Sequence, residues 1–331
     1  MKNLVTLTAG RVKLFVTENE KQMGELTAEH IVQSLKAQHQ RGAACVLWLM
    51  AAPSGFPVYR SLVVKAKEDG LVREILRGTH FFQFDDYPVD RKSGKFPVTF
   101  RYLLENHLFG PLKKVCGHLP YIHFLELTGT DRDAAIMARY KEDLLALKST
   151  GAYLIQLKGI GMDGHWGFHG AETPFEMAPD IIEVPMNPQN IHQQQQDWPD
   201  LFTNQADVPK TAVTFNVQMF LMAHEIIDNV PQLAKEYAVL ATYGTNEICS
   251  EIPSSALKSH SNAYAYLTLQ SARALLDFVA SRQNNPEAKL SRATLARLEK
   301  IWDDPRHPDA SAENVGVMHR VLKRIGIMEE S

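Results

Sequence analysis

Short apolar segments alternate with longer amphipathic segments along the chain, and no other feature constrains the fold as strongly. Residues 43–50 and 153–157 are apolar runs of a length that suits a buried strand. Residues 22–37 repeat their apolar side chains at the spacing of one helical face. Strands that alternate with helices indicate βαβ units and a parallel sheet. We therefore expect an α/β fold with a doubly wound, mostly parallel, Rossmann-like sheet.

The same patterns assign the remaining elements. Further strands are expected at 81–84 and 237–241, and the glutamine run 193–196 is expected to be an exposed helix or loop. Helices are expected from Pro57 onward and over 99–109, 132–148, 216–228 and most of 264–327. No Gly/Ser-rich linker divides the chain. We expect one α/β domain over 1–280 and a helical C-terminal extension over 281–331 that packs on it.

Composition excludes several classes of protein. The chain has 331 residues, and 35 Lys and Arg against 38 Asp and Glu give a formal net charge of -3. A near-neutral chain without a Lys/Arg-rich run has no positive electrostatic potential that would attract a nucleic acid, so we expect no nucleic-acid partner. The 3 cysteines show no CxxC or Cys/His spacing, which argues against a disulfide framework and a zinc site. The sequence leaves open whether the protein is a homo-oligomer.

The hydropathy of the sequence shows no segment that would direct the chain to a membrane. The first residues contain no apolar run typical of a signal peptide. No stretch of about 18 uncharged apolar residues occurs, as a membrane-spanning helix would need. We therefore expect a cytoplasmic protein without a membrane span.

Small and polar residues follow the expected strands, at the sheet edge where open α/β proteins bind ligands. The turn after 43–50 contains Ser54 and Gly55, whose hydroxyl and backbone amides suit an anion at a helix N-terminus. The next strand is followed by Asp85 and Asp86, adjacent carboxylates that suit a general base. A plain strand-to-helix turn and a solvated Asp turn explain the same residues, so both interpretations stay open.

The loop after 153–157 is the richest in polar groups. Asp163 and His165 lie among glycines that include Gly161 and Gly164. Glycine allows positive φ and close approach of the backbone to a ligand. A carboxylate two residues from an imidazole can orient it and raise its basicity. A tight loop with a structural histidine is the alternative, but three polar loops at three strand ends favour an active site.

These motifs together resemble the superfamily of glucosamine-6-phosphate deaminases/isomerases and 6-phosphogluconolactonases. The resemblance rests on FxxDDY from Phe82, GxGxDGHxxF from Gly159 and IPSSALKSH from Ile252. The segment TFRYLLENHLF over 99–109 resembles the helix that follows the first motif. The similarity extends over about residues 20–280, and the remainder has no counterpart in the family.

The resemblance implies a role for each matching residue. Asp85, with Asp86 beside it, would move a proton between C2 and C1 of the sugar. His165 would open the sugar ring as general acid and base, and Asp163 would orient it. Ser54 and the amides near Gly55 would hold a phosphate group. No metal or organic cofactor is implied.

The chain departs from the family pattern beyond the loop. The glutamate expected five residues after the loop histidine is Gly170, and Glu172 is the nearest substitute. His169 replaces the asparagine before that glutamate. The phosphate-binding arginine is expected near Gln189, where no arginine occurs. A phosphate dianion prefers Arg or Lys contacts, so these losses weaken the expected phosphate site.

The phosphate-binding lysine can be assigned in two ways. Family spacing gives Lys235 and makes 225–230 a strand, although Asp228 suits a buried strand poorly. We favour 237–241 as the strand instead, which leaves no lysine at this position. Lys258 is then the substitute.

We expect an aldose–ketose isomerase/deaminase that converts an amino-sugar phosphate into a ketose phosphate and ammonia. The first alternative is a 6-phosphogluconolactonase-type hydrolase, which the glycine at position 170 fits. The second is a catalytically silent sugar-binding or regulatory protein on the same fold. In each case the expected partner is a small sugar or sugar phosphate.

Overall fold

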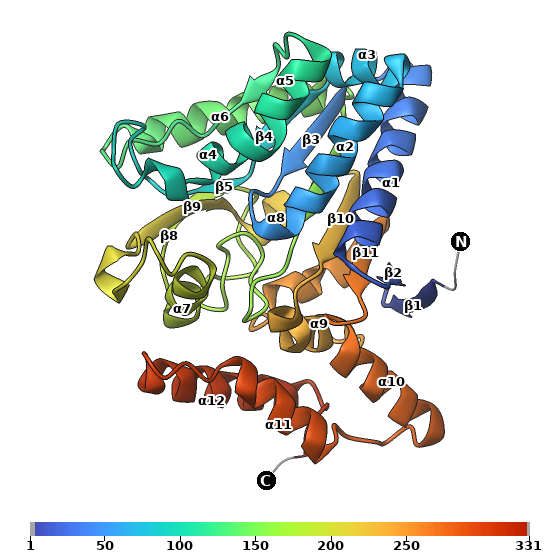
Figure 1. Ribbon diagram of the computed structural model, residues 1–331, viewed down its shortest axis with the longest axis vertical. Helices are drawn as coiled ribbons and strands as arrows, with labels where there is room; N and C mark the ends of the chain where they lie inside the picture. Colours follow the sequence, from blue (N-terminus) through green and yellow to red (C-terminus); the bar gives the residue numbers. More distant parts are fainter. Residues whose placement is uncertain (1–3, 330–331) are drawn as a thin grey trace.

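The computed structural model describes residues 4–329 and contains one large and one small sheet (Figure 1). Neighbouring strands of the large sheet are parallel, except that β1 and β2 form an antiparallel hairpin. Across the sheet, the strands are β1 (Val5–Ala9), β2 (Val12–Thr17), β11 (Ala263–Thr268), β10 (Glu225–Val230), β7 (Tyr153–Lys158), β3 (Cys45–Leu49), β4 (His80–Gln83) and β6 (Ile122–His123). The expected α/β fold with a mostly parallel sheet is confirmed.

The small sheet lies at the carboxyl end of β4. Its strands are antiparallel, in the order β5 (Asp85–Asp86), β9 (Thr211–Phe215) and β8 (Ile181–Pro185). Asp85 pairs with Thr214 of β9 in this register. The chain thus leaves the large sheet after Gln83 and enters the small one at once, which fixes the backbone of Asp85.

Helices surround the large sheet and continue beyond it. They are α1 (Glu20–Gln40), α2 (Phe56–Glu68), α3 (Gly70–Gly78), α4 (Phe100–Leu104), α5 (Gly110–Cys116), α6 (Asp133–Ser149), α7 (Pro188–Asp197), α8 (Val217–Phe220), α9 (Glu236–Tyr243), α10 (Arg273–Asn284), α11 (Arg292–Ile301) and α12 (Pro308–Arg324). Figure 1 shows α11 and α12 below α7 and α9, with α10 beside them. Within residues 4–329, no helix has the length and hydropathy to cross a membrane.

Several predicted elements are confirmed. The apolar run 43–50 contains β3, whose residues are all buried, as expected for a strand covered on both faces. The predictions at 81–84 and 153–157 correspond to β4 and β7. Helices lie at 22–37 and 132–148, and α2 begins with Pro57 in its first turn, where proline is tolerated.

The preferred strand at 237–241 is wrong, because these residues belong to α9 and the strand is β10. The polar residues of β10 are buried with partners from distant segments. Asp228 lies 3.2 Å from the ammonium of Lys158, and Asn229 accepts a hydrogen bond of 2.8 Å from the hydroxyl of Thr27. These partners remove the cost that argued against a strand here.

Two helical predictions also need correction. The segment 216–228 is helical only over α8 and then enters β10. The segment 264–327 contains α10, α11 and α12, but its first residues complete β11. The β1–β2 hairpin and the small sheet were not expected from the sequence, since their strands lack a long apolar run.

Candidate active site

A cavity of about 260 Å³ opens at the carboxyl ends of the central strands. β10, β7, β3 and β4 are neighbours in the sheet, so the segments that follow them meet at one edge. The predicted residues that line the cavity are Ser54, Asp85, Gly161, His165 and Lys235. The structure therefore brings together candidates from all three expected loops, and Lys235 lies with them.

Asp85 is buried at the wall of this cavity. Its Oδ1 atom has no hydrogen-bond partner among the described residues. Burial raises the pKa of the Asp85 carboxyl well above its usual range, and the neighbouring Asp86 raises this pKa further. A buried carboxyl with a free oxygen and a raised pKa is suited to accept and return a proton.

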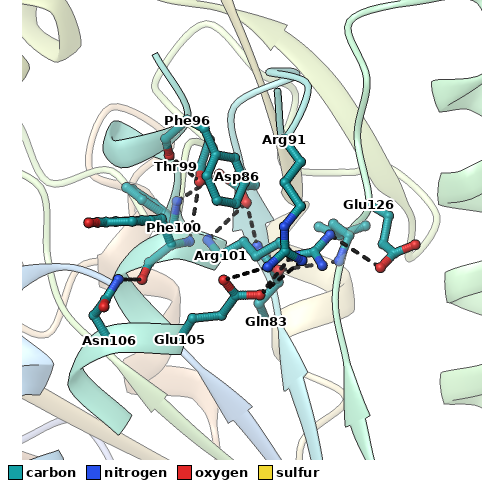
Figure 2. A network of polar contacts seen from close by, with 12 residues as sticks. Gln83, Asp86, Arg91, Phe96, Thr99, Phe100, Arg101, Glu105, Asn106 and Glu126 are labelled. Atoms are coloured by element: carbon teal, nitrogen blue, oxygen red, sulfur yellow. Dashed lines mark hydrogen bonds and ion pairs between the residues drawn. The ribbon is translucent and has the colours of Figure 1, made fainter. Parts of the chain in front are cut away.

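Asp86 does not line the cavity, and its carboxylate is occupied by hydrogen-bond donors (Figure 2). It accepts hydrogen bonds of 2.8 to 3.0 Å from the side chain of Gln83 and from the backbone N–H groups of Tyr87, Phe100 and Arg101. Burial raises the pKa of Asp86 to about 6, although these hydrogen bonds oppose the shift. The carboxylate therefore anchors the start of α4 and does not line the cavity.

Figure 2 also shows the ion pairs that surround this anchor. Arg101 pairs with Glu105 one helical turn later and with Glu126, at 3.2 Å in each case. Arg91 approaches Glu105 at 3.4 Å. The network ties α4 to the segments on both sides and holds the chain that follows Asp86.

The loop after β7 folds tightly around the imidazole of His165. A Cβ atom placed on Gly161 would lie 2.0 Å from the His165 ring, so only glycine fits there. Gly164 has φ of +93°, a conformation that side chains rarely adopt, and it packs against Ile252. Both glycines therefore shape the loop, as expected, although Gly164 itself does not line the cavity.

Asp163 and His165 form a pair within this loop. The Nδ1 atom of His165 lies 2.6 Å from Oδ1 of Asp163, which also accepts a 3.1 Å hydrogen bond from the His165 backbone. Burial opposes the charged form of Asp163, but the histidine outweighs it and holds the Asp163 pKa at about 2. Asp163 thus stays negative behind the imidazole, while the imidazole faces the cavity.

A lysine and a hydroxyl mark another part of the cavity wall. Lys235 is buried, and its ammonium donates a 2.9 Å hydrogen bond to Oε1 of Gln193. Burial lowers the pKa of Lys235, while Asp197 and Asp163 favour its charged form. The hydroxyl of Ser54 donates to Gln232 at 3.0 Å. Among the described residues that line the cavity, Lys235 is the only Lys or Arg.

Known proteins are similar to this chain in sequence. No family model matches the chain. The glucosamine-6-phosphate deaminase of Oceanobacillus iheyensis is 25% identical over 253 residues, which cover 76% of this chain and 91% of the relative. That of Shouchella clausii is 29% identical over 218 residues, covering 64% and 78%.

Solved structures agree with these relatives. A monomeric glucosamine-6-phosphate deaminase superposes with a TM-score of 0.64 at 21% identity, over 78% of this chain and 98% of its own. The 6-phosphogluconolactonase of Trypanosoma brucei gives 0.56 at 14%, over 80% and 99%. The sequence relatives support membership of the superfamily of glucosamine-6-phosphate deaminases and 6-phosphogluconolactonases, and the solved structures share its fold. The expected membership is confirmed.

This superfamily member has cavity residues that the sequence analysis missed. Gln193, Gln194, Gln196 and Asp197 of α7 all line the cavity. The run was expected to be exposed, but Gln193 is buried and accepts a 2.9 Å hydrogen bond from the backbone of Met162. One signal was available: the run carries no Lys or Glu, which a solvated helix usually has.

Glu172 does not replace the missing family glutamate. It is exposed and approaches the side-chain amide of Asn187 at 3.3 Å. It borders a separate surface pocket that includes Asn187 and Arg320 and not the central cavity.

Three further candidates lie outside the cavity. The N–H of Gly55 donates to the carbonyl of Ala52, so this amide is already occupied. His169 is fully buried, accepts a hydrogen bond from the backbone of Val217, and has its pKa lowered to about 4 by burial. Lys258 donates to the carbonyls of Thr245 and Glu247. In all three residues, these contacts hold the polar group within the protein and outside the cavity.

The described residues contain no group of three or more His, Cys, Asp or Glu side chains that could hold a metal ion. The cavity has its own acid, base and hydrogen-bond donor. These are the carboxyl of Asp85, the paired imidazole of His165 and the ammonium of Lys235.

Proposed function

We propose that this protein is an aldose–ketose isomerase/deaminase that acts on an amino-sugar phosphate and releases ammonia. One observation carries the proposal: Asp85, with an unpaired carboxyl oxygen, and His165, backed by Asp163, open into the same cavity. Two separate proton carriers around one small cavity suit a reaction that first opens a ring and then moves a carbon-bound proton.

His165 performs the ring opening. Its imidazole accepts the proton of the anomeric hydroxyl, and the ring C–O bond breaks as that proton passes to the ring oxygen. Asp163 remains charged behind the ring, so it stabilises the imidazolium that forms in between. The tight approach of Gly161 keeps the imidazole in place during the transfer.

Asp85 performs the isomerisation. Its carboxylate removes the proton from C2, and the amine gives up a proton as O1 gains one. The resulting acid then returns its proton to C1, which leaves a hydroxyl at C1 and an imine at C2. Water then adds to this imine, giving the ketose and ammonia. The raised pKa brings the carboxyl closer to the working pH, and the cationic amine of the substrate favours its charged form.

Lys235 and Ser54 hold the phosphate group of the substrate. Lys235 supplies a charge and Ser54 a hydroxyl donor at the same cavity. An Arg fork would add a bidentate contact that the cavity lining does not provide. We therefore propose a phosphate site of moderate affinity in a cytoplasmic enzyme.

Lactone hydrolysis is the second candidate function. Glu172 faces Asn187 instead of the cavity, so the carboxylate expected beside the loop histidine is missing there. In a hydrolase, His165 would activate a water molecule directly, and Asp85 would not be needed for proton transfer to carbon.

A substrate panel separates the two functions. The purified protein is incubated with hexosamine 6-phosphates and with a 6-phosphogluconolactone, and ammonia and acid are measured. Ammonia release with slow lactone hydrolysis supports the deaminase. Rapid lactone hydrolysis without ammonia would establish the hydrolase. Sugar binding without turnover of either would indicate a silent binding protein.

A further inference from the structure

The C-terminal extension packs against the segments that carry the cavity residues (Figure 1). A second hydrophobic cluster joins Trp302 and Met318 of the extension to Met162 and Tyr237. Met162 directly precedes Asp163, and Tyr237 lies two residues after Lys235. The extension therefore packs against both the histidine loop and the start of α9.

An ion pair joins the extension to the residue next to Lys235. Arg297 of α11 approaches Glu236 with two nitrogens, Nη2 at 2.7 Å and Nε at 3.0 Å from the same Oε1. The Glu236 side chain is 0% exposed and that of Arg297 is 24% exposed. Arg297 also contacts Asp277 of α10 at 3.0 Å. The two-nitrogen contact fixes the orientation of both side chains.

Glu236 connects this ion pair to the cavity through the backbone. It is the first residue of α9, where a carboxylate is favoured by the helix dipole, and it follows Lys235 directly. Lys235 lines the cavity and donates to Gln193 there. A shift of the Glu236 side chain would rotate the first turn of α9 and move the Lys235 ammonium relative to Ser54.

We propose that Arg297, acting through Glu236, is a positioning residue for the Lys235 ammonium, so that the extension takes part in binding the anionic group of the substrate. The proposal rests on the proposed function to the extent that Lys235 binds this anion. It assigns a role to a segment outside the part that resembles the family.

The test compares five variants with the parent protein. Lys235→Met removes the ammonium, and Arg297→Met removes the brace but leaves the buried Glu236 carboxylate uncompensated. Arg297→Met/Glu236→Met removes both charges together. It therefore separates the loss of the ion pair from the effect of an uncompensated buried carboxylate. Arg297→Lys keeps the charge but loses the planar fork. Arg292→Met is the control, since Arg292 is an exposed residue of the same helix.

Two measurements are made on each variant: kcat and KM with a hexosamine 6-phosphate, and the Kd of inorganic phosphate by calorimetry. We expect Arg297→Met/Glu236→Met to raise KM and the phosphate Kd on the order of tenfold, with kcat within about twofold of the parent. The KM and phosphate Kd of Arg297→Lys should lie between those of the parent and the double variant. Those of Arg292→Met should match the parent. Circular dichroism confirms the fold of each variant.

The outcomes distinguish the inference from the proposed function. If the double variant binds phosphate as the parent does, the inference is wrong, whatever the activity. If Lys235→Met leaves phosphate binding unchanged, the anion site is misplaced and the inference falls with it. If the parent lacks turnover but the brace variants still weaken phosphate binding, the proposed function fails and the inference holds. If the double variant does not fold, Arg297→Lys decides, and an unchanged Kd overturns the inference.

Discussion

Two neighbouring aspartates show how the surroundings of a residue decide its role. Asp86 accepts four hydrogen bonds and anchors a helix, whereas Asp85 keeps a free oxygen toward the cavity. The sequence showed only that two carboxylates follow a strand. Which of them reaches the substrate is decided by the pairing of β5 with β9, which depends on residues more than a hundred positions away.

Asp85→Asn should lower kcat about 10²–10⁴-fold, because the variant has no base for the C2 proton. It should also change how stability depends on pH. In the unfolded chain Asp85 ionises near a pKa of about 3.9, whereas burial raises its pKa in the folded protein. Between these pKa values the unfolded state binds fewer protons, so the free energy of unfolding falls as pH rises.

For a single group this slope is at most about 1.4 kcal/mol per pH unit. Denaturant unfolding of the parent and of Asp85→Asn from pH 4 upward measures it. We expect the parent to lose stability faster than the variant as pH rises. Parallel curves would show that Asp85 does not retain its proton in the folded state.

His165→Gln should lower kcat on a cyclic substrate about 10²–10⁴-fold with the fold intact. Asp163→Asn should also be slow, because the imidazole loses its orienting charge at 2.6 Å. The losses should not add in the double variant, since the two residues act as one unit. Steady-state kinetics of the single and double variants test this, and full additivity would contradict the pairing.

Among elements, the loop after β7 was the easiest to predict and the region around β10 the hardest. The glycines of the loop are visible in the sequence. The structure explains Gly161, because a Cβ atom added there would overlap the His165 ring. β10 was missed because its polar residues find their partners, Lys158 and Thr27, from other parts of the chain. α9 was taken for a strand because all of its residues are buried, which removes the helical alternation.

Gly161→Ala should impair catalysis without unfolding the protein. The added Cβ atom would overlap the His165 ring, so the imidazole must leave its place beside Asp163. We expect kcat to fall at least about tenfold, approaching the loss in His165→Gln. Gly94→Ala is the matched control, because nothing lies within 4 Å of its added Cβ and its φ is not in the left-handed region. Equal activity of the two variants would show that the loop tolerates a different histidine position.

At the scale of the whole molecule, a buried ion pair crosses the centre of the large sheet. Lys158 and Asp228 face each other on adjacent strands at 3.2 Å, both with 0% exposed side chains. Burial lowers the pKa of Lys158 and raises that of Asp228, and their mutual attraction opposes both shifts. The cost of burying both charges offsets much of the attraction in a pair of this kind.

Lys158→Met should destabilise the protein by about 3–5 kcal/mol, because it leaves a buried carboxylate without its partner. Lys158→Met/Asp228→Leu should recover most of that loss, since the pair can be exchanged for apolar contacts. The free energy of unfolding of both variants in urea tests this. A double variant as unstable as the single one would mean that the ion pair itself contributes the stability.

The central claim is that Asp85 and His165 convert an amino-sugar phosphate into a ketose phosphate and ammonia in one cavity. The most direct test measures ammonia and ketose phosphate in the same reaction, with the parent and Asp85→Asn run side by side. We expect equal amounts of the two products from the parent and almost none from the variant. Absence of ammonia from the parent, with lactone hydrolysis that Asp85→Asn leaves unchanged, would contradict it.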